Sequence, residues 1–300
     1  SDFQGSSHPF IGYLFTDNFE QIEVMRGAGS TLYGSEAIGG VINLRMKQGK
    51  EGRPRVKAIY EGGSYHTHRQ TYQVSGARYG FDYLMSYGHV GTNGIRSVDG
   101  YGGHIFGGNW GYRLGDNLEV RFQMNANGSE IDVNNSPRSL ANNVLIQDRT
   151  DPNHLRKARF VHYNGSVKHR LGERFEHAIR LGFADTDRRF INSPDEINPR
   201  PFSDNQFDGN TANIEYQTNL KLNEHLSIVN GIEHERERLT QISSLEVKDR
   251  LEFYRFGWFN ENRLSFLEDT LNFAAGARIT HHEKFHTHQS GELSGSYLFR

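Results

Sequence analysis

Apolar and polar residues alternate along most of the chain from residue 53 onward. Between Leu118 and Asn127, every even-numbered residue is apolar and every odd-numbered one is charged or carries an amide. Similar alternation occurs in Ala212–Leu222, Leu271–Thr280 and Ile179–Ala184. A period of two is that of a β-strand with one apolar and one polar face. The pattern predicts about twelve strands, the first near Arg55–Gly63, and no helix of consequence beyond Arg53.

The predicted strands and the gaps between them are typical of a membrane barrel. The strands run for roughly ten residues or more, whereas ~5–6 is usual in soluble proteins and about ten span a bilayer at a tilt. Short turns lie near Arg78–Phe81, Leu114–Asn117, Leu171–Arg174, Asn223–His225 and Leu267–Asp269. Longer segments lie between them, near Thr92–Gly100, Val133–His154, Asn192–Gln206 and Ser243–Asp249. This layout favours an all-β fold, a transmembrane antiparallel β-barrel, over a soluble sandwich or barrel.

The composition fits that interpretation and excludes several other classes. Only 35% of the residues are hydrophobic and the mean hydropathy is -0.71, and no run approaches the ~18–20 apolar residues of a membrane helix. Barrel strands alternate, so their average hydropathy can stay polar. A net charge of -2 does not indicate a nucleic-acid binder. With no cysteine in the chain, disulfides and thiolate sites are excluded.

No catalytic motif is present. The chain has no G-x-S-x-G and no H-E-x-x-H, and Gly49-Lys50 is followed by Glu51, so there is no Walker A motif. Carboxylates are scattered over both strand faces. We therefore predict a protein that is not an enzyme, with no resident cofactor and no metal site.

The first fifty residues follow a different pattern. Ile22–Leu44 contains a short apolar strand, a glycine turn, a brief helix and a second apolar strand. The segments Glu20–Gly27 and Leu32–Asn43 closely resemble the end of the plug domain of TonB-dependent outer-membrane receptors, whose pattern is approximately I-E-R-I-E-V-L-R-G-P-x-S-x-L-Y-G-x-x-A-I-G-G-V-I-N-I. The sequence departs from this pattern at Gln21, at Met25 and at Ala28. At the position of Ala28 the family often has proline.

This resemblance implies a plug inside a 22-stranded barrel in the bacterial outer membrane, crossed many times by strands. We expect residues 1–50 to be the C-terminal part of the plug and residues 51–300 the first part of the barrel, about 12 of its 22 strands. The amino-terminal TonB box and the closing strands are expected outside this chain. The implied partners are a TonB-type energy-transducing protein, a small-molecule nutrient and outer-membrane lipid.

Three groups of residues are candidates for that function. The resemblance implies that Glu23 and Arg26 contact the barrel wall, although such a pair also serves internal plug stability. It also places Ser1–Phe10 where the family has an apical plug loop that faces the ligand. Its candidate ligand-binding residues are Gln4, Ser6, Ser7, His8 and Phe10, and an ordinary polar connector is the alternative. Side chains along a strand point alternately to its two faces, and we call the face that a residue takes its strand parity. If the apolar parity faces lipid, the polar parity faces the lumen of the barrel. This places a third group in the lumen: Arg121, Gln123, Asn125, Arg180, Glu215, Gln217 and Arg278.

The family implies a bulky, scarce nutrient, either a vitamin B12-like corrinoid or a ferric siderophore. The stretches 61–68 and 80–87 loosely resemble the opening hairpins of the cobalamin-receptor branch, which slightly favours a corrinoid. A haem receptor would use the histidines His281, His282, His286 and His288, with His66 and His68. Calcium would be held by Asp132, Asn134, Asn135, Asp148 and Asp151, but their spacing favours a solvated loop. A passive porin or adhesin-like barrel is the other alternative.

Overall fold

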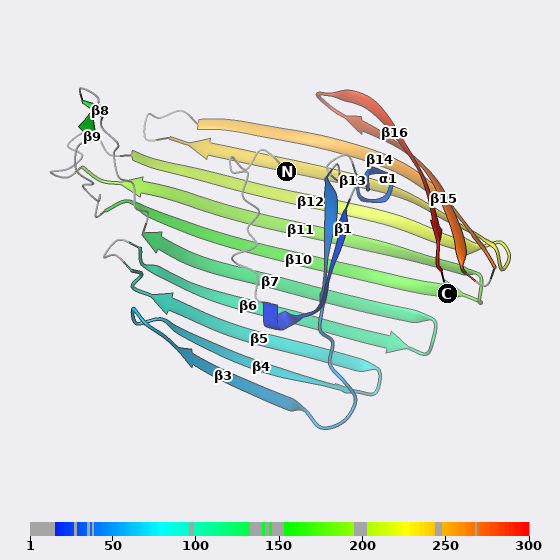
Figure 1. Cartoon of the computed structure of the whole chain (residues 1–300), viewed down its shortest axis with the longest axis horizontal. Coiled ribbons are helices and arrows are strands. Elements are labelled where there is room, and N and C mark those ends of the chain that lie inside the picture. The colour runs from blue at the N-terminus through cyan, green and yellow to red at the C-terminus, as the bar shows by residue number, and fades with distance from the viewer. Residues whose placement is uncertain are drawn as a thin grey trace.

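The largest element of the protein is a twelve-stranded antiparallel sheet (Figure 1). The structure, a computed structural model, describes residues 16–26, 29–34, 37, 39–95, 99–132, 140–141, 144–145, 153–194, 203–243, 248–267 and 269–299. The strands of the sheet are β3 (Arg55–Gly62), β4 (His68–Arg78), β5 (Phe81–Thr92), β6 (Tyr101–Leu114), β7 (Leu118–Asp132), β10 (Leu155–Leu171), β11 (Phe175–Asn192), β12 (Ser203–Lys221), β13 (Leu226–Ile242), β14 (Lys248–Phe266), β15 (Leu271–His282) and β16 (His286–Tyr297). Each strand pairs with the next in chain order, so the fold is an up-and-down meander.

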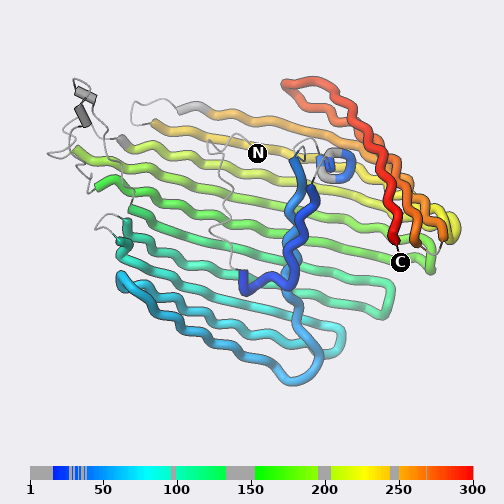
Figure 2. The backbone as a smooth tube through the Cα atoms, in the orientation of Figure 1, coloured from blue at the N-terminus to red at the C-terminus, as the bar shows by residue number. Residues whose placement is uncertain are grey.

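The strand number, the first strand and the connections confirm the expectation from the sequence. β3 begins at Arg55 as predicted, and the connections at one end of the sheet are tight turns of two to four residues. The long connections lie at the other end, where β8 (Leu140–Ala141) and β9 (Val144–Leu145) form a separate two-stranded sheet (Figure 1). The sheet is strongly curved, and β14–β16 turn across its open side (Figure 2).

The convex face of the sheet is apolar near the tight turns. Residues that pair directly across strands share a face, as Trp110 does with Phe122 and Tyr163 with Phe183. Phe122 and Tyr163 are diagonal neighbours on the same face, and the four rings form a stacked ladder with centroids 5.7–6.3 Å apart. Large apolar side chains on this face are exposed, among them Leu181 at 53%. The alternation predicted from the sequence is therefore present, with its apolar parity facing outward.

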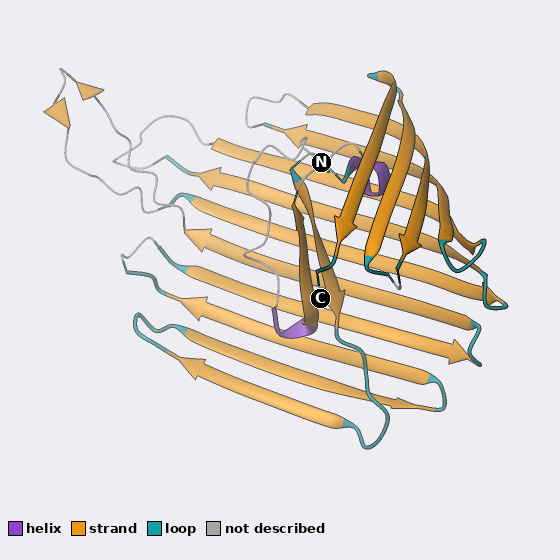
Figure 3. Ribbon diagram, turned by 45° about the vertical axis from the view of Figure 1, so that its right-hand side comes forward, coloured by secondary structure: helices purple, strands orange, loops and turns teal. Residues whose placement is uncertain are grey.

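A small amino-terminal unit lies on the concave face (Figure 3). This unit consists of η3 (Thr16–Asn18), β1 (Phe19–Arg26), α1 (Ser30–Tyr33) and β2 (Gly40–Met46), and β1 pairs with β2 as an antiparallel hairpin. Buried side chains between unit and sheet are largely polar and include Asn18, Thr31, Asn109 and Arg278. Among the described residues, no helix is long and apolar enough to cross a membrane.

Candidate functional site

The amino-terminal unit touches the concave face at two separate places. At the first, which we call the η3 contact, the carboxylate of Asp17 lies 2.5 Å from Arg69 Nη2 and 3.7 Å from Lys57 Nζ. Lys47, just beyond β2, donates from Nζ to the Asp17 carbonyl at 2.7 Å. Strand parity explains the meeting, because Lys57 and Arg69 both occupy inward positions on β3 and β4. Both ends of the amino-terminal unit are thus held at one point of the sheet.

The η3 contact rests on a buried polar network in the wall. Asn109 donates to the Lys47 carbonyl at 2.9 Å and accepts from Arg121 Nη1 at 2.9 Å. Arg121 in turn makes two 3.0 Å hydrogen bonds to the carboxylate of Asp82, which is 1% exposed. A fork-on-carboxylate pair fixes orientation as well as charge. The network therefore holds the Asn109 amide in position to receive the amino-terminal unit.

Close approach at the η3 contact requires a glycine in the wall. Asn18 is 1% exposed, and a Cβ added to Gly107 on β6 would lie 2.2 Å from its Nδ2 atom and 2.8 Å from Ser86 Oγ. No side chain fits in that space. Gly107 therefore lets η3 lie directly on the backbone of the sheet.

The second place, the α1 contact, lies on β14–β16. Thr31 is fully buried, and a Cβ added to Gly276 would lie 3.3 Å from Thr31 Cβ. Beside it Arg278 is ion-paired with Glu233 and donates from Nε to Thr280 Oγ1 at 3.0 Å. A Cβ added to Gly34 would be in ordinary contact with the Arg278 guanidinium at 3.7 Å. The short helix thus sits over a buried ion pair of the wall.

Both contacts are small and lie at different strands of the sheet. The η3 contact is made by ion pairs and hydrogen bonds, whereas Thr31 at the α1 contact lies close to the backbone of Gly276. The Asp17 pairs at the η3 contact are partly exposed, with Arg69 34% and Lys57 50% exposed, so water can replace them, and pairs of this kind contribute ~0–1 kcal/mol. An arrangement of this kind fixes the unit in one position and still allows a second position to be populated when force or a ligand favours it. This geometry therefore allows the amino-terminal unit to dock reversibly on the concave face of the sheet.

The lumen residues predicted by parity all lie on the concave face. Arg121 and Arg278 underlie the two contacts described above. Asn125 donates to Met46 Sδ at 3.6 Å. Arg180 pairs with Glu215 at 2.5 Å and also donates to Gln217 at 2.9 Å, while Gln123 pairs with Asn109 and Asn164 in the register. Most of the set therefore meets the amino-terminal unit or its neighbours in the wall.

The other predicted residues have different positions. Glu23 accepts a 2.8 Å hydrogen bond from Asn43 and lies 4.0 Å from Arg45, so its described partners are within the β1–β2 hairpin. Arg26 is the last residue of β1 and pairs with Gly40. Their contact with a barrel wall stays a prediction. Gln4, Ser6, Ser7, His8 and Phe10 lie outside the described residues.

One concave-face cluster was missed at the sequence level. Beyond the apolar band, Arg156 lies over the ring of Phe190 at 4.9 Å, and Phe190 packs edge-on against Phe207 at 6.0 Å. Arg188, 4% exposed, lies 5.9 Å from the Phe207 ring. The Arg156 Nε atom is buried without a hydrogen-bond partner among the described residues. Extending the strand parity past the apolar positions would have placed these four residues on one face.

The candidate haem histidines are not brought together. His66 and His68 lie at the β3–β4 connection, at one end of the strand order, and His281, His282, His286 and His288 lie on β15–β16 at the other. Within the described ranges, no group of three His, Asp or Glu side chains has the geometry to hold a metal ion. Of the calcium candidates, only Asp132 lies among the described residues.

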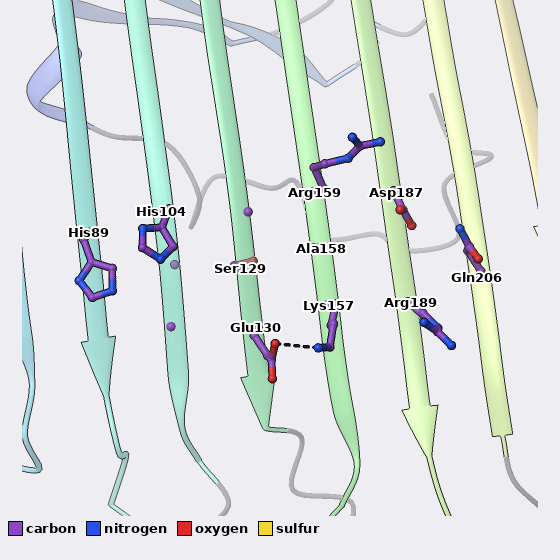
Figure 4. Close-up of a pocket in the computed structure, with 13 residues that line it drawn as sticks. His89, His104, Ser129, Glu130, Lys157, Ala158, Arg159, Asp187, Arg189 and Gln206 are labelled. Carbon is purple, nitrogen blue, oxygen red and sulfur yellow. Dashed lines mark ion pairs between the residues drawn. The ribbon is translucent and has the colours of Figure 1, made fainter.

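A groove of about 580 Å³ lies on the opposite, convex face near the long connections (Figure 4). Its walls carry His89, His104 and several charged side chains that have partners. Glu130 and Lys157 are 3.0 Å apart and Arg159 lies 3.2 Å from Asp185. Outside the groove, a hydrogen bond from Arg189 lowers the pKa of Asp204. Because these residues have outward parity, the groove does not open into the lumen.

Comparison with known proteins identifies the amino-terminal unit. Residues 2–41 match the family model described as the TonB-dependent Receptor Plug Domain. The predicted resemblance to TonB-dependent receptors is confirmed. The unit is accordingly called the plug below, and the twelve-stranded sheet the barrel wall.

Solved structures agree with this result. The ferric enterobactin receptor PfeA of Pseudomonas aeruginosa, a Q482A mutant in complex with enterobactin, matches with a TM-score of 0.75 and 18% identity over 96% of this chain and 48% of its own. The siderophore receptor PirA from Acinetobacter baumannii matches with 0.71 and 16% over 96% and 47%, and the copper transporter OprC with 0.71 and 12% over 95% and 48%. No curated protein matches the chain.

These likenesses establish the fold, which is that of the barrel and plug in the solved structures named above. The chain spans about half the length of the solved structures that it matches. The all-β barrel architecture expected from the sequence is confirmed, and the convex face carries an apolar band of the kind that membrane barrels turn toward lipid.

Proposed function

We propose that the chain is part of a TonB-dependent uptake receptor that binds a bulky, scarce nutrient outside the cell and imports it when the plug is displaced. Residues 1–50 form the end of the plug and residues 51–300 the first part of the barrel. The observation that carries this proposal is the plug docked on the barrel wall by two small contacts, of which the η3 contact is made by ion pairs and hydrogen bonds. A passive porin needs no such docked unit.

In this mechanism the wall residues bind the plug reversibly. Asp17 leaves Arg69 and Lys57, and Thr31 leaves Gly276, when a TonB-type partner pulls on the plug. Water then solvates the separated groups, so release costs little. Glu23 and Arg26 are proposed to meet barrel strands as the plug moves. The function is transport rather than catalysis.

The ligand we propose is an anionic metal chelate of the ferric siderophore class. Arg156 and Arg188 supply positive charge at the long-loop end of the lumen, and Phe190 and Phe207 supply ring faces. Planar guanidinium groups suit carboxylate, catecholate and hydroxamate oxygens. PirA is a siderophore receptor and PfeA a ferric enterobactin receptor, and both have the same fold as this chain. Gln4, Ser6, Ser7, His8 and Phe10 are proposed to face the ligand from the plug.

Titration of the full-length receptor in detergent tests the ligand class. We expect ferric enterobactin to quench intrinsic fluorescence saturably, and Arg156→Gln to weaken its binding by about tenfold or more, as for loss of a charged hydrogen bond of ~1.5–3 kcal/mol. Lys157→Gln is the matched control, because this neighbouring cation points outward and pairs with Glu130. Saturable binding of cyanocobalamin or haem alone would overturn the proposed ligand class and leave the corrinoid or haem alternative.

A further inference from the structure

Three arginines surround one carboxylate on the convex face of β13 and β14. Glu252 lies 3.2 Å from Arg238, 3.3 Å from Arg250 and 3.9 Å from Arg236, and it accepts a 3.1 Å hydrogen bond from the Tyr254 hydroxyl. The register explains the cluster, because Arg238 pairs with Glu252 and Arg236 with Tyr254. We call Arg236, Arg238, Arg250 and Glu252 the arginine cluster.

The cluster has a surplus of positive charge. Three guanidinium groups face one carboxylate, which leaves a net charge of +2 within a few ångströms. The hydrogen bond from Arg238, with those from Tyr254 and Arg250, lowers the pKa of Glu252, so the carboxylate is ionised at neutral pH. The Nε atoms of Arg236 and Arg238 are buried without hydrogen-bond partners in the described part of the chain. The three arginine side chains are nevertheless 30–56% exposed, so an anion can reach the guanidinium groups from outside.

The pleat of β13 produces this surplus. The run Glu233–Arg238 alternates acid and base, so its glutamates point to the lumen and its arginines outward. In the lumen, Glu233 pairs with Arg278 and Glu235 with Arg255 at 2.7 Å. A segment that is nearly neutral in sequence thus has a basic convex face. The convex face of β11–β12 is the opposite, since it carries Asp185, Asp187, Asp204 and Asp208 against Arg189 alone.

The cluster lies where the apolar band ends. Along β14, the outward residues after Trp258 and Phe256 are Tyr254 and then Glu252, and the three aromatic side chains are 39–49% exposed. On β13, Arg236 comes ten residues after Leu226, at the tight-turn end of the strand. About ten tilted residues cross the hydrocarbon core. The arginines therefore lie at the level of lipid headgroups on the long-loop side of the membrane.

We propose that the arginine cluster binds the phosphate of a lipid headgroup in the outer leaflet. Arginine forks match phosphate oxygens bidentately, a phosphate dianion neutralises the surplus of +2, and the aromatic residues below are placed to contact the acyl chains of the same molecule. The described part of the chain leaves the cluster 25–56% exposed. This proposal depends on the fold and not on which nutrient is imported.

Native mass spectrometry of the full-length receptor in detergent tests the site with purified lipid A, its monophosphorylated form and phosphatidylcholine as probes. We expect lipid A to bind most tightly, and the variant Arg236→Gln/Arg238→Gln/Arg250→Gln to bind it about tenfold more weakly or worse. Lys157→Gln/Arg159→Gln, which removes two outward cations that have carboxylate partners, is expected to bind like the wild type. Retention of lipid A by the triple variant would refute the site.

A second variant distinguishes binding from a structural role. Glu252→Gln raises the charge of the cluster to +3, so lipid A binding is expected to tighten, whereas loss of a merely structural ion pair would weaken or not change it. This variant also decides the matter if the triple variant fails to fold. Competition with inorganic phosphate separates the two sources of phosphate. If millimolar phosphate displaced lipid A completely, the cluster would be a free-anion site and the lipid assignment would be wrong.

Discussion

Uptake by the full-length receptor carrying Thr31→Cys/Gly276→Cys is expected to stop when the two cysteines are oxidised and to return when they are reduced. A Cβ added to Gly276 lies 3.3 Å from Thr31 Cβ, close to the ~3.5–4.5 Å of disulfides. The chain has no cysteine of its own, so no other disulfide forms within it. The bond would fix α1 on the wall at the α1 contact. If the plug must leave the wall for import, the locked receptor binds its ligand and does not transport it.

A cross-link within the wall is the control for this experiment. Ala274 on β15 pairs directly with Ser294 on β16, and neither contributes to the two plug contacts described here. Oxidised Ala274→Cys/Ser294→Cys is therefore expected to import at the wild-type rate. Transport by the oxidised Thr31–Gly276 pair at that same rate would show that the plug does not need to leave β15.

Replacing Gly107 by leucine is expected to open the barrel to passive entry. The new side chain would occupy the space of Asn18, whose Nδ2 atom lies 2.2 Å from the position of its Cβ. Overpacking of this kind costs roughly 1–3 kcal/mol, which is as large as the few polar bonds of the η3 contact provide together. The plug should then lie away from β6, and cells should admit large antibiotics that the barrel normally excludes.

The matched control lies on the same strand and faces the other way. A Cβ added to Gly102 meets no atom within 4 Å, and Gly102 has outward parity on β6. Gly102→Leu should leave antibiotic exclusion intact. Equal leakage from the two leucine variants would indicate damage to the strand itself and would count against the proposed role of the η3 contact.

The fold was largely predictable because its signals are local. A period of two is visible within ten residues, as in Leu118–Asn127, and tight turns such as Leu171–Arg174 are marked by Gly, Glu and Arg between apolar runs. The plug segment was recognisable from twenty consecutive residues. Parity alone assigned Arg121 and Arg278 to the concave face, because the pleat leaves a strand residue only two directions.

The role of each inward residue was not predictable from the sequence. Arg121 is connected to the plug through Asn109, which donates a hydrogen bond to the Lys47 carbonyl. Asn109 and Lys47 are 62 residues apart, so the sequence could not show whether Arg121 meets the plug or a ligand. Asp17 and Arg69 are 52 residues apart, and no periodicity relates them. Parity also places Arg156 beside Phe190 only once the strand register is known. Such contacts are set by how two units dock, and this information is not carried by any one segment.

Energised uptake is the measurement that tests the central claim most directly, namely that this chain is part of a receptor powered through its plug. Import of radiolabelled ferric enterobactin should be followed in cells that carry the full-length receptor with and without its amino-terminal partner-binding segment. The account predicts that deletion abolishes import and leaves cell-surface binding of the same ligand unchanged. Import that persists at the undeleted rate would contradict it and identify a passive pore.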